Sequence, residues 1–180
     1  LCRYEDETKL SITVIGGGPT GVEMAGAMAE LIRGPLTSDQ AKVAKNIKVR
    51  LIEAGPRLLP SFAASLSERT KKDLEKLGVK VMVNTAVKEL SAKKITLADN
   101  STVDSAITIW AAGVKGSDAM VNLNLPVEAN RVAVETTMQV KNYPNIWALG
   151  DIAGAKGKDG RALPMVAPVA IQQGKFIAKQ

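Results

Sequence analysis

Histidine is missing from the 180 residues of this chain, and cysteine occurs once, as Cys2. Without histidine the protein has neither an imidazole general base nor a serine nucleophile activated by one. A single cysteine excludes an internal disulfide and a cysteine metal cluster, and we interpret Cys2 as an inert thiol near the start of the sequence. These absences exclude histidine-based hydrolytic chemistry, and we predict no metal site.

Long apolar runs and aromatic residues are also scarce. No run approaches the roughly 20 apolar residues of a membrane span, and no charged-then-apolar leader opens the sequence. Aromatic residues make up 3%, and the lysines behind the formal charge of +6 are scattered. A nucleic-acid surface usually combines clustered basic residues with stacking rings, so we expect no nucleic-acid partner. The opening and closing residues resemble the interior of a longer protein.

A glycine-rich loop stands out between an apolar run and a helix-forming stretch. Residues 12–15 are β-branched at every position, which predicts a buried parallel strand. Gly16, Gly18 and Gly21 then form G-x-G-x-x-G, and a helix is expected over 19–33, with proline suited to its first position. A strand before this motif and a helix after it are the context in which it binds dinucleotides.

The three glycines have separate roles in such a site. The first permits a tight turn, the second lets a pyrophosphate approach the backbone, and the third lets the helix pack close to the sheet. The N–H groups of the first helical turn then face the phosphates. We therefore predict a dinucleotide at this loop; the alternative is a glycine turn that serves packing only.

An acidic residue at the end of the next strand completes the prediction. Residues 47–52 are expected to form that strand, which ends at Glu53, after a polar surface excursion at 35–46. A carboxylate there can accept hydrogen bonds from the ribose hydroxyls of an adenosine. Because it would repel a 2′-phosphate, we predict a preference for NADH over NADPH, which Arg57 could weaken. The alternative is a solvated carboxylate at a strand end.

The following residues predict the rest of an α/β domain. A helix at 65–77 and a strand at 79–83 complete a β-α-β-α-β unit. Short strands at 86–90, 94–97 and 101–104 indicate an antiparallel meander. The apolar residues 106–110 predict a further central strand. The fold class expected is α/β, a Rossmann-like parallel sheet in three layers with an antiparallel β-meander.

The last third of the sequence is less regular. We expect irregular structure at 122–130, edge strands at 131–134 and 138–140, and a buried strand at 146–149. A flexible charged loop follows at 154–160, and a helix is expected from Ala170 to the end.

Five segments, in this order, resemble one known family. They read GGGPTGVE (16–23), EAGPR (53–57), WAAGV (110–114), ALGD (148–151) and APVAIQQG (167–174). Together they are similar to the two-dinucleotide flavoproteins, the pyridine nucleotide-disulfide oxidoreductases. Within these they resemble the type II NADH dehydrogenases, which are NADH:quinone oxidoreductases. The similarity extends over about residues 10–180.

The resemblance implies an internal fragment of a longer enzyme. It makes residues 1–116 the NADH-binding domain and residues 117–180 the returning, incomplete segment of an FAD-binding domain. The intact protein would oxidise NADH and pass electrons through FAD to a membrane quinone. It would be cytoplasmic and peripheral on the inner face of the cell membrane, held by a tail that this sequence lacks, and a homodimer is an open option.

The resemblance also implies roles for individual residues. Glu23 would lie near the nicotinamide, and Gln172 and Gln173 near the isoalloxazine and the quinone. The remaining residues would contact the two cofactors, and they are Gly16, Gly17, Gly18, Pro19, Thr20, Gly21, Glu53, Ala112 and Gly113 for NADH, and Gly150, Asp151 and Ala170 for FAD.

Plainer interpretations remain open for some of these residues. Glu23 could be a first-turn acid that the helix dipole favours. Asp151 could be a turn residue, and Gln172 and Gln173 could belong to a polar helix face. For the whole chain the alternatives are the NAD domain of a flavin-dependent disulfide reductase and a non-catalytic NADH-binding module.

Overall fold

The computed structural model of the chain describes residues 10–34, 44, 46–114, 116 and 119–180. The chain divides into two compact units, Leu1–Gly113 and Val114–Gln180. The surface excursion predicted at 35–46 lies almost entirely outside the described residues.

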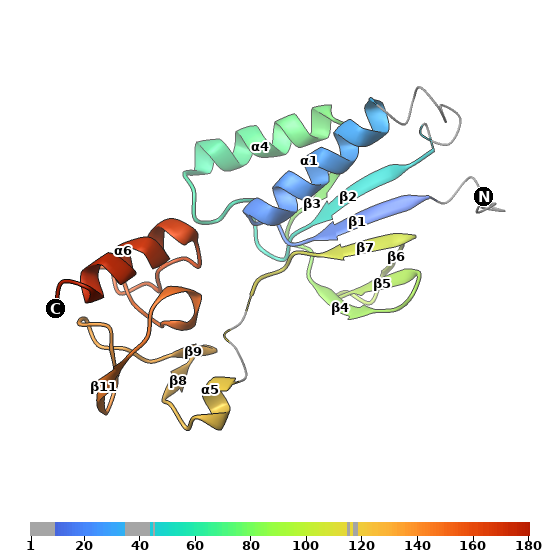
Figure 1. Cartoon of the computed structure of the whole chain (residues 1–180). Helices are drawn as coiled ribbons and strands as arrows, with labels where there is room; N and C mark the ends of the chain where they lie inside the picture. Colours follow the sequence, from blue (N-terminus) through green and yellow to red (C-terminus); the bar gives the residue numbers. More distant parts are fainter. Residues whose placement is uncertain (1–9, 35–43, 45, 115, 117–118) are drawn as a thin grey trace. The chain divides into compact units, whose positions relative to one another are not determined.

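The first unit is built on a parallel sheet (Figure 1). Its strands are β1 (Ser11–Ile15), β2 (Lys48–Ile52), β3 (Lys80–Met82) and β7 (Ile107–Trp110), in the order β3-β2-β1-β7. All three pairings are parallel. Because the carboxyl ends of all four strands meet at one edge, the loops that follow them converge there.

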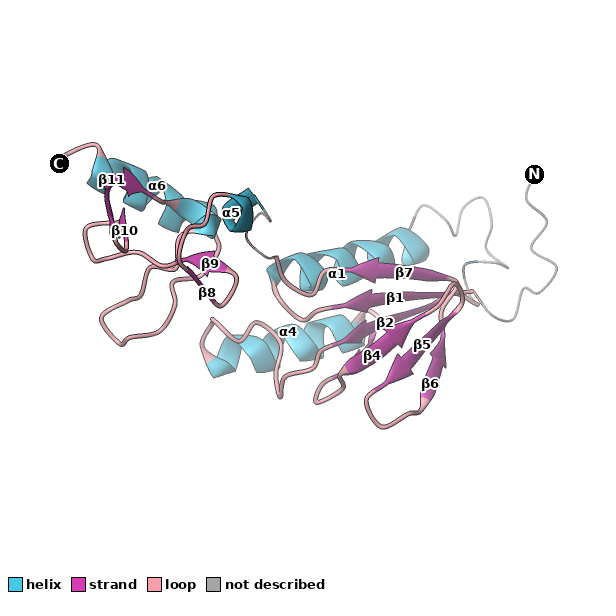
Figure 2. Cartoon of the chain, turned by 90° about the horizontal axis from the view of Figure 1, so that it is seen from below, coloured by secondary structure: helices cyan, strands magenta, loops and turns pink. Residues whose placement is uncertain are grey.

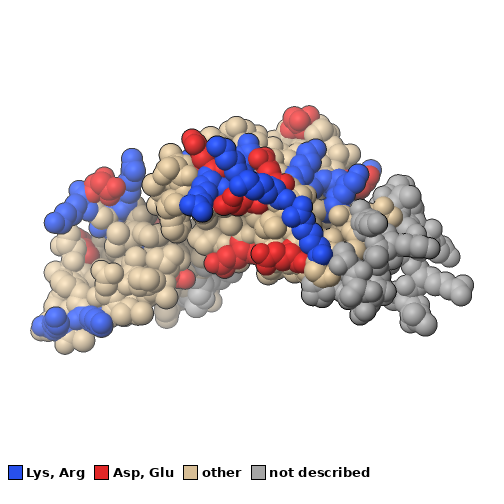
Figure 3. All heavy atoms as spheres, turned by 90° about the horizontal axis from the view of Figure 1, so that it is seen from above, with Lys and Arg blue, Asp and Glu red and all other residues tan. Residues whose placement is uncertain are grey.

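Two helices cover one face of this sheet. Helix α1 (Pro19–Arg33) and helix α4 (Ala64–Lys76) pack on Val14 and Leu51 through a shared apolar core. Helix α1 contributes small residues, Ala25 and Ala29, which allow its backbone to approach the strands closely. The outer face of α4 mixes both charge signs (Figure 3), with i,i+3 and i,i+4 ion pairs that stabilise a solvated helix.

An antiparallel meander covers the other face. Its strands are β4 (Val87–Leu90), β5 (Lys94–Leu97) and β6 (Thr102–Asp104). Ile95 and Leu97 pack against Ile15 and Ile52 of the parallel sheet. Figure 2 shows the three meander strands side by side. Helices, parallel sheet and meander therefore form three layers (Figure 1), which confirms the expected fold class.

The prediction that residues 106–110 form a central strand is wrong. In the described part of the chain β7 pairs with β1 alone and lies at the end of the sheet. Ile107 and Trp110 are exposed as a result. The apolar run correctly predicts a strand of the parallel sheet. Its place in the strand order depends on which strands pair, and local composition does not encode that pairing.

The second unit is smaller and has short elements. They are α5 (Ala119–Asn122), β8 (Val127–Glu128), β9 (Arg131–Val132), β10 (Gln139–Val140), β11 (Tyr143–Trp147), the 3-10 turn η1 (Gly150–Ile152) and α6 (Ala167–Ile177). Strands β8 and β9 form one antiparallel pair, and β10 and β11 form another. A core that includes Met120, Val132, Met138 and Val140 holds them together.

Three predictions for this unit need correction. The segment expected to be irregular, 122–130, contains strand β8. The buried strand expected at 146–149 overlaps β11 only at 146–147, and Ile146 and Trp147 are exposed because β11 belongs to a two-stranded ribbon. Helix α6 begins at Ala167, before Ala170, and ends at Ile177. Pro168 fits its first turn because an N–H there has no helical partner to lose.

No helix in the described ranges is both long enough and apolar enough to cross a bilayer.

Candidate dinucleotide site

A cavity of about 350 Å³ opens at the carboxyl ends of β1, β2 and β7. Part of its wall comes from residues that the sequence singles out for a cofactor: Gly16, Gly18, Glu53, Ala112 and Gly113. The same residues that the motif spacing links in sequence therefore surround one cavity. The rest of the wall is Ile15, Ile52, Ala54, Thr85, Ala86, Val87, Trp110 and Ala111.

The three motif glycines are required for different physical reasons. At Gly16, φ is +111°, and a Cβ there would lie 2.5 Å from the carbonyl oxygen of Ala111. A Cβ at Gly21 would overlap the carbonyl oxygen of Gly16. A Cβ at Gly18 would meet nothing within 4 Å, and its φ of −72° is open to any residue. The fold itself requires glycine at positions 16 and 21. Gly18 instead lines the cavity, and the space beside it is empty.

The N-terminus of α1 lies at this empty space. Gly18 is the N-cap, and no side chain caps the helix. The Val22 N–H donates to the Gly18 carbonyl at 3.0 Å. An uncapped helix start beside open space suits an anion, since its first amide groups point outward and the dipole is positive there.

The Glu53 side chain is held by the two loops beside it. One carboxylate oxygen accepts the Gly17 N–H at 2.6 Å, and the other accepts the Gly55 N–H at 2.6 Å. Glu53 is half-buried, so the interpretation as a merely solvated carboxylate at a strand end does not hold. Each carboxylate oxygen can accept more than one hydrogen bond, which leaves acceptor capacity for hydroxyl groups.

The Arg57 guanidinium is committed to its own loop. Nη1 donates to the Phe62 carbonyl at 2.8 Å and to Ser67 Oγ at 3.2 Å, and Nη2 donates to the Pro60 carbonyl at 2.6 Å. Ser67, which is buried, donates in turn to the Leu58 carbonyl. Arg57 is not among the residues that line the cavity.

The sequence motifs did not predict one part of the cavity wall, the loop after β3. Thr85, Ala86 and Val87 follow β3, and the Thr85 N–H donates to the Glu53 carbonyl at 2.9 Å. A signal for them was present, because a loop after a parallel strand reaches the same sheet edge as the glycine loop. Trp110, which the sequence places in a strand and in the WAAGV segment, is 57% exposed and lines the cavity.

Glu23, which the resemblance associates with the nicotinamide, is exposed on α1 and does not line the cavity. It is the fifth residue of the helix, and the first turn contains no acid. The alternative of a first-turn acid favoured by the helix dipole is therefore wrong. Pro19 and Thr20 are exposed at the helix start, and Gly17 is buried behind Glu53.

The second unit brings together the residues predicted for FAD. Gly150 has φ +72°, and a Cβ on it would lie 3.6 Å from the Cβ of Ala170. Asp151 is exposed on the turn η1, and its carboxylate makes no hydrogen bond or ion pair with any described residue. An exposed, unpaired carboxylate on a tight turn can accept hydrogen bonds from ligand hydroxyls.

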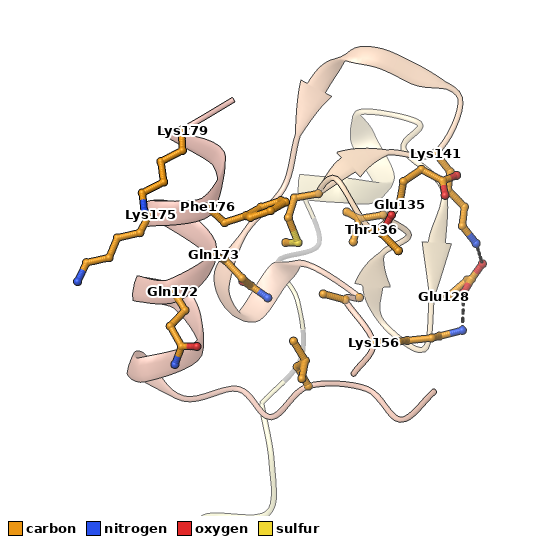
Figure 4. Close-up of a pocket in the computed structure, with 15 residues that line it drawn as sticks. Glu128, Glu135, Thr136, Lys141, Lys156, Gln172, Gln173, Lys175, Phe176 and Lys179 are labelled. Atoms are coloured by element: carbon orange, nitrogen blue, oxygen red, sulfur yellow. Dashed lines mark hydrogen bonds and ion pairs between the residues drawn. The ribbon is translucent and has the colours of Figure 1, made fainter. Parts of the chain in front are cut away.

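The two glutamines of α6 differ in environment. Gln172 is exposed, whereas Gln173 is buried and its Oε1 accepts the Gly150 N–H at 2.7 Å. Both line a cavity of about 680 Å³ within this unit (Figure 4). A polar helix face therefore describes Gln172 but not Gln173.

No group of three or more histidine, cysteine, aspartate or glutamate residues that could hold a metal ion occurs in the part of the chain described here.

Curated proteins with similar sequences share a type of name. The chain is 35% identical to the type II NADH:quinone oxidoreductase Ndh of Mycobacterium tuberculosis, over 94% of this chain and 38% of the relative. It is 31% identical to the type II NADH:quinone oxidoreductase of Haemophilus influenzae, over 98% of this chain and 40% of the relative. It is 35% identical to an internal alternative NAD(P)H-ubiquinone oxidoreductase of Arabidopsis thaliana mitochondria, over 97% and 34%. The chain thus spans two fifths or less of the length of these relatives.

The fold has a counterpart among solved structures. NDH2 from Plasmodium falciparum in complex with NADH superposes with a TM-score of 0.76 at 25% identity, over 86% of this chain and 34% of that one. A water-forming NADH oxidase from Lactobacillus brevis shares the fold, with a TM-score of 0.69 over 96% of this chain and 36% of that one.

The family model that describes pyridine nucleotide-disulphide oxidoreductases matches residues 3–174, which include the glycine loop, Glu53, the turn at Asp151 and most of helix α6. The glycine loop, the acidic strand end and the exposed aspartate turn follow one another in the order seen in the sequence motifs. Because the family model also covers nearly the whole chain, the chain belongs to the pyridine nucleotide-disulphide oxidoreductase family.

Proposed function

We propose that this chain is the NADH-binding part, with a portion of the FAD-binding part, of a type II NADH:quinone oxidoreductase. The observation that carries the proposal is the cavity in which the empty space at Gly18, the uncapped start of α1 and the Glu53 carboxylate lie together. The names of the relatives, at 31 to 35% identity, support the same function.

The cavity suggests how NADH is bound. The pyrophosphate lies beside Gly18, against the amide groups at the start of α1, with Gly16, Gly17, Pro19, Thr20 and Gly21 forming the loop around it. Glu53 accepts hydrogen bonds from the adenosine ribose. Ala112 and Gly113 flank the rest of the cofactor, since they end the cavity at β7, and Glu23 serves the nicotinamide end.

The contacts of Glu53 and Arg57 favour NADH over NADPH. The Glu53 carboxylate is fixed by two backbone N–H groups, so it cannot easily turn away from a 2′-phosphate. Arg57, the cation of the neighbouring loop, is instead occupied by the Pro60 and Phe62 carbonyls and by Ser67 of α4. Among the described residues that line the cavity, no lysine or arginine offsets the repulsion from the fixed carboxylate.

The second unit supplies part of an FAD site and residues near which a quinone binds. Asp151, Gly150 and Ala170 contact FAD, and Gln172 and Gln173 lie toward the isoalloxazine and the quinone. FAD, if bound, would supply the hydride acceptor and the electron transfer to quinone, and the side chains of this chain would bind and orient the cofactors. The full-length protein would act from the cytoplasmic face of the cell membrane as a peripheral protein, alone or as a homodimer.

Equilibrium binding of NADH and NADPH to the 180-residue chain tests this function. We expect NADH to bind at least about tenfold more tightly, a difference of about 1.4 kcal/mol. Equal or tighter binding of NADPH would refute the role given to Glu53. Failure of both nucleotides to bind would refute the assignment of the cavity.

A further inference from the structure

The turn η1 presents Asp151 but has little internal structure to hold it in place. It consists of Gly150, Asp151 and Ile152, and its own closing bond runs from the Ala153 N–H to the Gly150 carbonyl at 3.1 Å. Gly150 has a positive φ, and Asp151 is exposed. The direction in which the carboxylate points must therefore depend on groups outside the turn.

Gln173 holds the first peptide group of this turn. It is the one buried residue of α6, at 6% exposure, whereas its neighbours Ile171 and Phe176 are exposed. Figure 4 shows its side chain directed from α6 toward the loops that face the helix. Burying a primary amide is unfavourable unless it is hydrogen-bonded, and its Oε1 accepts the Gly150 N–H at 2.7 Å. Gln173 is thus buried for a polar contact rather than for packing.

Arg131 holds the peptide group that follows Asp151. This arginine of β9 is also 6% exposed, and it forms no ion pair with any described acidic residue. Its Nε donates to the Asp151 carbonyl at 3.1 Å, and its Nη1 donates to the Leu163 carbonyl at 2.8 Å. Burying a guanidinium is unfavourable because the charge loses its hydration, so a buried arginine whose described partners are backbone carbonyls marks a specific task.

We propose that Arg131 and Gln173 are positioning residues. Arg131 of β9 and Gln173 of α6 hydrogen-bond the backbone of η1 and so orient the Asp151 carboxylate toward the flavin. Gln173 fixes the Leu149–Gly150 peptide at the start of the turn, and Arg131 fixes the Asp151–Ile152 peptide while also tying the turn to Leu163, ahead of α6. This inference rests on the proposed role of Asp151 in binding FAD. It gives Gln173 an indirect action through Gly150, in place of direct contact with flavin or quinone.

The two ends of the Gln173 amide separate these roles. Positioning uses Oε1, whereas Nε2 has no hydrogen-bond partner among the described residues and would be the atom that donates to flavin or quinone. Gln173→Glu keeps an acceptor for the Gly150 N–H and removes the donor. Gln173→Met has similar size and removes both.

The first experiment measures FAD affinity in the full-length protein that contains this chain. We expect Gln173→Met and Arg131→Met to bind FAD about tenfold or more weakly, the size of effect typical when a residue that orients a ligand contact is lost. Gln173→Glu should stay within about threefold of the parent protein, which is under 1 kcal/mol. Arg161→Met, which removes an exposed arginine of the same unit, is the control and should bind normally. Equal damage by Gln173→Glu and Gln173→Met would overturn the proposal.

The second experiment is amide hydrogen exchange of residues 150–153 in the same protein without FAD. Exchange there should be faster by about tenfold or more in Gln173→Met and Arg131→Met, with the core strands unchanged. Uniformly faster exchange throughout the unit would mean that the two residues serve stability only, and would overturn the proposal.

Asp151→Asn separates failure of this inference from failure of the function on which it rests. If that variant binds FAD normally, the proposed FAD role of Asp151 is wrong. Hydrogen exchange alone then decides whether Arg131 and Gln173 hold the turn η1 in place. If Asp151→Asn weakens FAD binding while the Arg131 and Gln173 variants do not, the function stands and the positioning role is refuted.

Discussion

At the scale of single residues, Gly18 separates ligand binding from folding. Because a Cβ at this position meets nothing within 4 Å, we expect Gly18→Val to fold normally yet bind NADH at least about a hundredfold more weakly, since the side chain would occupy the place of the pyrophosphate. Gly21→Ala is the matched comparison: its Cβ would overlap the Gly16 carbonyl, so it should lose stability. Circular dichroism and NADH titration measure both effects, and normal NADH affinity in folded Gly18→Val would contradict the phosphate-loop assignment.

Thr13 carries a buried hydroxyl that contributes nothing favourable. It lies in β1, is 0% exposed, and its Oγ1 has no hydrogen-bond partner among the described residues. Removing an unsatisfied buried hydroxyl while keeping the side-chain shape should raise the free energy of unfolding, so Thr13→Val is expected to stabilise by about 1 kcal/mol.

Ser11, two residues earlier on the same strand, is the control for Thr13. Its buried hydroxyl donates to the Asp104 carbonyl at 2.9 Å, so Ser11→Ala should destabilise by about 1 kcal/mol. Denaturant unfolding measures both variants. Destabilisation by Thr13→Val would show that its hydroxyl has an acceptor.

At the scale of elements, the loop between β2 and α4 is organised by Arg57. Two of its hydrogen bonds go to the loop carbonyls of Pro60 and Phe62, and the third joins the loop to Ser67 in the first turn of α4. We expect Arg57→Met to lower the free energy of unfolding by about 1 to 2 kcal/mol, because these bonds involve a charged donor. The ratio of NADH to NADPH affinity should stay within about twofold, since Arg57 does not line the cavity.

Arg69→Met is the control for Arg57. Arg69 makes an exposed ion pair with Asp73 at 3.6 Å, and such pairs contribute little, so the free energy of unfolding should not change measurably. A shift of the affinity ratio beyond tenfold in Arg57→Met would place the guanidinium at the ribose instead.

At the scale of the whole molecule, we expect the isolated 180-residue chain to be colourless and unable to reduce quinone, although it binds NADH. The sequence contains one G-x-G-x-x-G loop, and it adjoins Glu53 and the cavity proposed for NADH. FAD would therefore lack a glycine loop for its own pyrophosphate, and Asp151 and α6 alone would hold it weakly.

An absorbance spectrum in the flavin region and an NADH:quinone assay test this expectation, with the full-length protein as the positive control. Stoichiometric bound flavin in the 180-residue chain, or quinone reduction without an added flavoprotein, would show that the glycine loop or the extent of the FAD site is misassigned.

Local physics allowed the sequence to determine the βα unit around the glycine loop. β-Branched residues favour a strand, Pro19 is accepted at a helix start, and Gly34 ends the helix, so the predicted helix 19–33 matches α1. The spacing of the glycines and the acid at the end of the next strand also predicted which residues meet in the cavity. These features depend on neighbours along the chain or on the rule that parallel strands end at one edge.

Tertiary structure alone decided the features that depend on partners far apart in sequence. The bond from Gly17 to Glu53 spans 36 positions, and the bond from Gly150 to Gln173 spans 23. Composition could not show that Gln173 is buried while Ile171 is exposed, or that β7 lies at the end of the sheet. A residue type sets what a side chain can bind, but which donor stands opposite it depends on how separate elements pack.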